Sequence, residues 1–147
     1  MFKRILVGLD GSSGSEEALT KAIELTRLQQ ADLWALSVAE VVPRYVETID
    51  EVAEASDHAN AYFGELQRQA YDRAKQAGIE LQVEILVGHA AHAVVEFAET
   101  HDIDLVVIGH SGQTSIWGQF LGTTADKIVR HAPCSVLVVR TEASNEE

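Results

Sequence analysis

Three glycines and two threonines in the C-terminal half of the chain are the residues whose spacing points to ligand binding. Gly109, Gly112 and Gly122 follow the spacing Gly-x2-Gly-x9-Gly, and Gly122 is followed directly by Thr123 and Thr124. Glycine allows the backbone to come close to a ligand, and the first turn of a helix offers N–H groups without helical partners, which bind anions. We therefore expect a phosphate-binding loop that ends in a helix beginning near Gly122.

A second loop of small and polar residues, Asp10 to Ser15, ends the first apolar run of the chain. Asp10 carries a carboxylate that could contact a ligand or a metal ion, although an aspartate here could also serve only to form the turn. In the same loop Ser13 and Glu16 have capping-box spacing, which predicts the start of a helix. The two loops would form one site only if the strands that precede them are neighbours in a sheet.

Apolar runs and helical periodicity alternate along the whole chain. Five short apolar segments are typical of buried strands, and four segments carry the apolar stripe of an amphipathic helix. The predicted strands are Lys3 to Leu9, Asp32 to Ala39, Leu81 to Val87, Asp104 to Ile108 and Ser135 to Val139, and the predicted helices are Ser15 to Gln29, Tyr62 to Gln76, His89 to His101 and Thr123 to His131. This alternation predicts an open, mostly parallel α/β sheet whose ligand site lies at the carboxyl ends of the strands.

The composition limits the partners of such a protein. With 23 Asp and Glu against 11 Lys and Arg, the net charge is -12, which argues against binding to nucleic acid or to an anionic membrane surface. A phosphate would have to be held by backbone N–H groups. No apolar run approaches the roughly 20 residues needed to span a bilayer, and the single cysteine, Cys134, favours a reducing, cytoplasmic setting. We expect one domain over residues 1–141, followed by an acidic tail at 142–147.

Four separated segments, together with the glycine spacing, resemble the universal stress protein family. They are Val7 to Ser12 after the first strand, Gly88 after the third, Asp104 to Gly109 before the glycine loop, and His131 to Val139 around the last strand. The resemblance covers essentially the whole chain. It implies a five-stranded parallel sheet in the order 3-2-1-4-5 with helices on both faces, of the adenine-nucleotide α-hydrolase-like type, in which strands one and four are neighbours.

The resemblance also implies the ligand: ATP, or ADP or AMP, accompanied by Mg²⁺ or Mn²⁺. It implies that adenine lies against Val38 and the loop after strand one, and that Asp10 contacts adenine or ribose and is the residue available to the metal ion. The implied nucleotide-binding residues are Asp10, Gly11, Ser12, Val38, Gly109, Ser111, Gly112, Gly122, Thr123 and Thr124. Many family members carry Arg or His directly before the second glycine, where this chain has Ser111, and His110 could replace that cation.

The function implied by the resemblance is that of an ATP-binding stress-response regulator, acting as a homodimer joined through Ser135 to Arg140. Pairing would cover an apolar edge strand, which is otherwise prone to aggregation. Two other functions remain open: slow ATP hydrolysis or self-phosphorylation, and a nucleotide-free interaction protein of the same fold. Hydrolysis has weak support, because neither a general base nor a phosphate-binding lysine accompanies the loop.

Three further features of the sequence have more than one interpretation. Five acidic residues between Glu47 and Asp57 predict a solvated loop or helix face, which with Trp117 is the surface expected to contact an unidentified protein partner. Trp117 could instead stack on the ligand or pack at an edge. His89, His92 and Glu96 share one helical face and could hold a metal ion, although no fourth ligand is apparent.

Overall fold

The computed structural model describes residues 1–40, 49–110 and 121–141, with only the backbone of residues 49–56 and 59. Strands and helices alternate from end to end. Their order is β1 (Arg4–Gly8), α1 (Ser13–Gln29), β2 (Asp32–Glu40), α2 (Ile49–Gln76), β3 (Leu81–Gly88), α3 (Ala90–Thr100), β4 (Leu105–Gly109), α4 (Thr123–His131) and β5 (Ser135–Val139). The strands form one parallel sheet in the order β3-β2-β1-β4-β5. The predicted fold class and strand order are confirmed.

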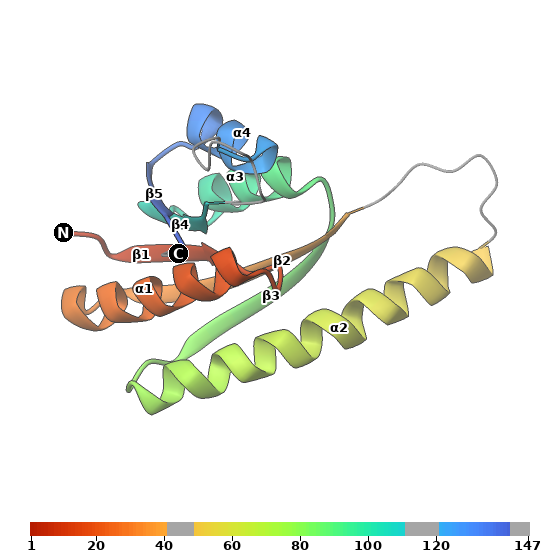
Figure 1. Cartoon of the computed structure of the whole chain (residues 1–147), viewed down its shortest axis with the longest axis horizontal. Helices are drawn as coiled ribbons and strands as arrows, with labels where there is room; N and C mark the ends of the chain where they lie inside the picture. Colours follow the sequence, from red (N-terminus) through yellow and green to blue (C-terminus); the bar gives the residue numbers. More distant parts are fainter. Residues whose placement is uncertain (41–48, 111–120, 142–147) are drawn as a thin grey trace, which may run out of the picture.

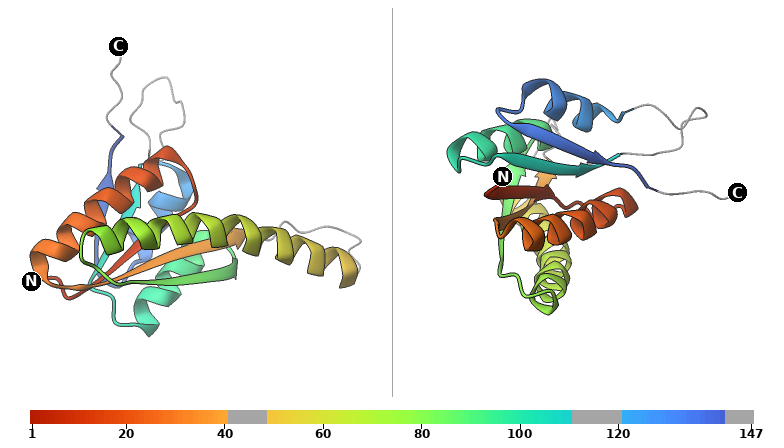
Figure 2. Two further views of the ribbon diagram at one scale, coloured as in Figure 1. Left: turned by 90° about the horizontal axis from the view of Figure 1, so that it is seen from below. Right: turned by 90° about the vertical axis from the view of Figure 1, so that its left-hand side faces the viewer.

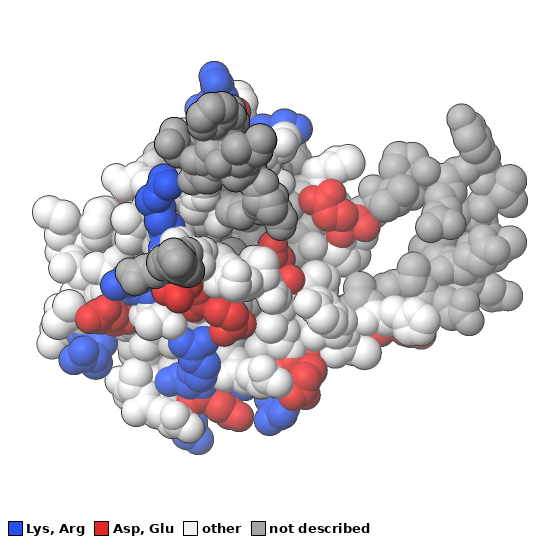
Figure 3. Space-filling model, viewed as in Figure 1, with Lys and Arg blue, Asp and Glu red and all other residues white. Residues whose placement is uncertain are grey.

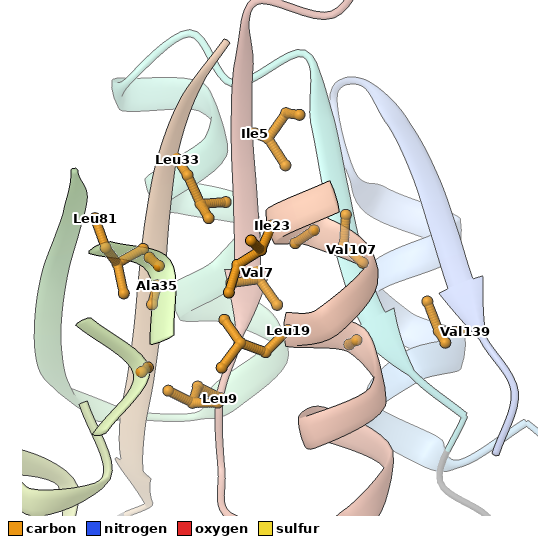
Figure 4. Packing of buried hydrophobic residues seen from close by; sticks show 14 of the residues in the cluster. Ile5, Val7, Leu9, Leu19, Ile23, Leu33, Ala35, Leu81, Val107 and Val139 are labelled. Atoms are coloured by element: carbon orange, nitrogen blue, oxygen red, sulfur yellow. The ribbon is translucent and has the colours of Figure 1, made fainter. Parts of the chain in front are cut away.

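The sheet separates two hydrophobic cores. Helices α1 and α2 cover one face and α3 and α4 the other (Figures 1 and 2). Figure 4 shows the first core, where Leu19 and Ile23 of α1 lie against Ile5 and Val7 of β1. The central strand β1 is buried on both faces because side chains alternate along it, which explains why its sequence is a continuous apolar run.

Helix α1 begins one residue away from the predicted cap. The N-cap is Ser12, whose backbone is extended and whose Oγ accepts a hydrogen bond from the Ser15 N–H at 3.1 Å. Ser13 is already the first helical residue, so the predicted capping box of Ser13 and Glu16 is wrong. The spacing alone could not decide this, because several serines of the loop are able to cap a helix.

Helix α2 begins at Ile49 and not at Tyr62 as predicted. Its C-terminal half packs on β2 and β3, whereas its N-terminal half extends past the sheet (Figures 1 and 2). The described part of the acidic segment, from Asp50 to Asp57, is therefore helical; Glu47 lies outside the described residues. The helix ends as expected, before Gly78 with its left-handed φ of 81°.

The surface of the protein carries both signs of charge. On the face drawn in Figure 3, Lys and Arg side chains lie among Asp and Glu side chains. None of the described helices is long and apolar enough to cross a membrane.

Candidate functional site

A cavity of about 660 Å³ lies near the carboxyl ends of β1, β2 and β4. Its walls come from the loop between β1 and α1, from α3, from the first turns of α4 and from the residues that follow β5. β1 and β4 are adjacent in the sheet, so the loop after β1 meets the end of β4, as the strand order implied. The volume falls within the roughly 300–1,000 Å³ of small-molecule sites.

Most of the predicted site residues lie on this cavity. Those that line it are Asp10, Ser12, Val38, Gly109, Gly122, Thr123 and Thr124. Gly11 belongs to the same loop but does not line the cavity; its φ is 89°, and a Cβ there would overlap the hydroxyl of Tyr62 on α2. Ser111, Gly112 and Trp117 lie outside the described residues.

Asp10 is fixed by its own loop. Its Oδ1 accepts a hydrogen bond from the Ser12 N–H at 2.9 Å, and its backbone N–H donates to Ser15 Oγ at 3.3 Å. The turn-forming role considered for Asp10 is therefore present in the structure. It uses one of the two carboxylate oxygens, and the residue also lines the cavity.

Gly109 has a packing role next to the cavity. A Cβ on Gly109 would overlap the carbonyl group of Gly14 in α1, and a Cβ on Gly14 would lie 2.9 Å from the carbonyl oxygen of His110. Both glycines are therefore needed for the first turn of α1 to lie against the end of β4.

Three helices begin at the cavity, and their first turns differ in how they are capped. Ser12 caps α1, and the Glu40 carboxylate accepts a hydrogen bond from the Ala90 N–H of α3 at 3.0 Å. α4 begins after Gly122, which has no side chain, and within the described residues no side chain caps this helix. The first N–H groups of α4 are thus placed to bind an anion in the cavity.

The floor of the cavity is apolar. It includes Leu36 and Val38 of β2, Val94 of α3, Ile108 of β4 and Ile128 of α4. All five belong to, or pack against, the hydrophobic core between the sheet and helices α3 and α4. The site therefore offers a flat apolar ligand group a dry surface beside the N-terminus of α4.

Two side chains with basic groups, His110 and Arg140, also line the cavity. His110 is buried, and its backbone N–H donates to the carbonyl oxygen of Val139 at 2.7 Å, which continues the pairing of β4 with β5. Arg140 is the next residue after Val139 and is exposed at the cavity wall. It is the only Arg or Lys among the described residues that line the cavity.

The comparisons with known proteins agree with this architecture. The model of the universal stress protein family matches residues 1–140. The chain belongs to the universal stress protein family. A universal stress protein from Methanocaldococcus jannaschii is 31% identical to this chain, in an alignment that covers 95% of this chain and 83% of that protein.

Solved universal stress proteins have the same fold. UspA from Lactobacillus plantarum superposes with a TM-score of 0.85 at 32% identity, over 95% of this chain and 98% of that one. A universal stress protein solved in complex with cAMP superposes with a TM-score of 0.75 at 28% identity, over 96% and 99% of the two chains.

In this universal stress protein one alternative considered from the sequence is not formed, and one residue of the cavity was not predicted. In the described part of the chain no group of three or more His, Cys, Asp or Glu side chains is arranged to hold a metal ion, so the site considered at His89, His92 and Glu96 is not formed. Sequence reasoning also missed Arg140 as a residue of the cavity. Strand alternation could have placed Arg140 on the same face as Val136 and Val138, but the sequence does not show that α4 covers this face.

Proposed function

We propose that this universal stress protein binds an adenine nucleotide, ATP in particular, in the cavity at the carboxyl ends of the strands and acts as a nucleotide-dependent regulator. The observation that carries the proposal is that one cavity combines an apolar floor with the N-terminus of α4, which no side chain of the described residues caps. An adenine ring binds to an apolar surface, and a phosphate chain binds to the N–H groups of a helix N-terminus. The relative solved with cAMP supports this ligand class.

The arrangement of the cavity suggests how ATP would lie. Adenine would lie on the floor near Val38, the ribose near Asp10, and the phosphates against the N–H groups that follow Gly122, where Thr123 and Thr124 add hydroxyl groups. Mg²⁺ in proteins is commonly bound by one carboxylate together with substrate phosphates, and Asp10 is the carboxylate that lines this cavity within the described residues.

We further propose that the protein forms a homodimer through β5 and the adjacent Arg140. β5 is an edge strand that pairs with β4 on one side, and Leu137 in its centre is 38% exposed. Antiparallel pairing with a second copy would satisfy the outer backbone groups of the strand and cover this side chain. Sedimentation of a monomer at micromolar concentration would contradict the dimer.

Thermal denaturation with and without ligand tests the nucleotide proposal. At about 100 times its Kd, ATP with Mg²⁺ should stabilise the fold by about 2.7 kcal/mol, which raises Tm by roughly 5–10 °C. Adenosine should also stabilise the protein, because the floor binds the base. If neither ligand changes Tm, the proposed function is wrong.

A pair of tryptophan variants shows whether the effect comes from this cavity. Val38→Trp places a large ring on the floor and should abolish stabilisation by both ligands. Val87→Trp introduces the same ring at an exposed position of β3 that is 62% accessible and does not line the cavity, and it should leave the ligand effect unchanged. Equal responses of the two variants would show that the ligands bind elsewhere.

A further inference from the structure

The position of Arg140 is set by the end of the β4–β5 ladder. Gly109 lies opposite Val139 in the register, and the His110 N–H donates to the Val139 carbonyl oxygen at 2.7 Å. Arg140 therefore lies beside the carboxyl end of β4, at the end of the strands where the cavity also lies. Figure 2 shows β5 beside β4 with α4 over this part of the sheet.

Strand alternation indicates the face on which Arg140 lies. Val139 belongs to the core on the α1 side, whereas Val136 and Val138 pack against the core on the α3 and α4 side. A residue after Val139 returns to the α4 side. This agrees with the presence of Arg140 in the wall of the cavity, together with Thr123 and Thr124 of the first turn of α4.

Arg140 carries a positive charge in a protein that is strongly acidic. The whole chain has a net charge of -12, and the other charged side chain lining the cavity within the described residues is the acidic Asp10. Backbone N–H groups at a helix N-terminus carry only partial charge, so they discriminate weakly between ligands of different charge. A guanidinium presents a full charge and a planar fork of donors that matches phosphate oxygens.

We propose that Arg140 is the specificity-determining residue that makes the cavity favour adenine nucleotides with a chain of phosphates over adenosine and over cyclic nucleotides. The inference rests on the proposed function, since it assumes that the base lies on the apolar floor. Attraction by Arg140 increases with the number of phosphate charges that reach the wall formed by β5 and α4. Adenosine, which has none, is bound by the floor alone.

Titration calorimetry with adenosine, cAMP and ATP tests the role of this charge in the full-length protein. Arg140→Gln should weaken ATP about tenfold or more, which is the size of one charge-assisted hydrogen bond, and change adenosine less than about twofold. The effect on cAMP, with one phosphate charge, should lie between them. Raising the salt concentration should reduce the difference between wild type and variant for ATP.

Two control variants separate this role from a general charge effect. Arg27→Gln removes the same charge from the last turn of α1, away from the cavity, and should leave all three affinities unchanged. Arg140→Lys keeps the charge without the planar fork and should recover part of the ATP affinity. Equal loss of ATP affinity in Arg27→Gln and Arg140→Gln would overturn the proposal.

The remaining outcomes distinguish this inference from the proposed function. If wild type binds adenosine and ATP but Arg140→Gln leaves their affinity ratio unchanged, the inference is wrong and the proposed function stands. If wild type binds none of the three ligands, both fail. Because Arg140 adjoins the proposed dimer strand, sedimentation velocity is run on each variant; a loss of ATP affinity that appears only with a change of assembly overturns the proposal.

Discussion

Gln67 of α2 is a buried polar side chain at which a single isosteric substitution should have a large, pH-dependent effect on stability. Its side chain is 3% exposed, and its Nε2 donates to the carbonyl oxygen of Glu84 at 2.8 Å and to Ser37 Oγ at 3.0 Å, with the carbonyl oxygen of Ala35 at 3.4 Å. Ser37 Oγ in turn donates to the carbonyl oxygen of Leu9 at 2.7 Å. This network joins α2 to β2, β3 and the end of β1.

Gln67→Glu keeps the shape of the side chain and replaces the donor group by an acceptor. An ionised carboxylate would face the carbonyl oxygens of Ala35 and Glu84 and a Ser37 hydroxyl whose proton is already donated to Leu9. The folded protein should therefore favour the protonated form and raise the pKa of the introduced carboxyl group above its unfolded value of about 4.3. The folded state then binds the proton that the unfolded state has lost. Stability therefore falls as pH rises above about 4.3, until the folded-state pKa is passed.

The expected size of this loss follows from the pKa shift. A rise of two to three units, ordinary for a buried carboxyl group, corresponds to roughly 3–4 kcal/mol at pH 7, in addition to any loss that is present at pH 4. Urea denaturation of wild type and Gln67→Glu at several values between pH 4 and pH 8 measures it. Taking the difference between the two proteins removes the pH dependence that they share.

Gln69→Glu is the matched control. Gln69 is exposed on the same helix and donates to Glu65 Oε2 at 3.1 Å, so the control adds the same charge at the solvent-exposed surface, beside the Glu65 carboxylate. Its difference from wild type should stay within about 0.5 kcal/mol at every pH. A Gln67→Glu variant whose loss does not depend on pH, or matches that of the control, would refute the reasoning.

Two other predictions concern a helix cap and the single cysteine. Glu40→Ala removes the acceptor of the Ala90 N–H and should lower the free energy of unfolding by about 1 kcal/mol, or Tm by roughly 3 °C in calorimetry. Glu40→Gln keeps an acceptor and should lose less. Equal stability of Glu40→Ala and wild type would contradict the cap. Burial raises the pKa of the Cys134 thiol, and the negative charge of Asp104 adds to this effect. Alkylation of the native protein should therefore be slower than that of a free cysteine at pH 8 and should accelerate at higher pH. The raised pKa of the thiol should also reduce the stability of the fold as pH rises above the unfolded value of about 8.5. Alkylation at the rate of free cysteine would contradict the raised pKa.

The sequence predicted the strands well because strands that are buried on both faces consist almost entirely of apolar residues. The apolar residues of β1 and β4 are covered by helices on both faces of the sheet, so they form continuous apolar runs. The run of β1 lies between Arg4 and Gly8, and that of β4 between Asp104 and Gly109. The order of the strands came from the family resemblance, since alternation of strands and helices is compatible with several orders. It was this order that brought Asp10 and Gly109 to one cavity.

The start of α2 could not be predicted, for a physical reason. The segment from Ile49 to Asp57 lies in the half of the helix that extends past the sheet. Its acidic composition is as typical of a solvated loop as of a helix. The missing information is tertiary: the sequence does not show how far the sheet extends beneath the helix.

The inclusion of Arg140 in the site also depends on tertiary structure. A basic residue after a strand is common on protein surfaces, and only the register of β5 against β4 and the position of α4 place it on the cavity. The capping of α3 by Glu40 is a similar case, because the two residues that form this hydrogen bond are 50 positions apart in the chain.

The close approach of Gly14 and Gly109 has a consequence for the motions of the molecule. With no side chain between them, the first turn of α1 and the end of β4 touch backbone to backbone. Such a contact has no side-chain rotamers to rearrange, so a change in the distance between α1 and β4 at this point has to move the backbone itself. We therefore expect any opening of the cavity that admits a nucleotide to come from its other walls.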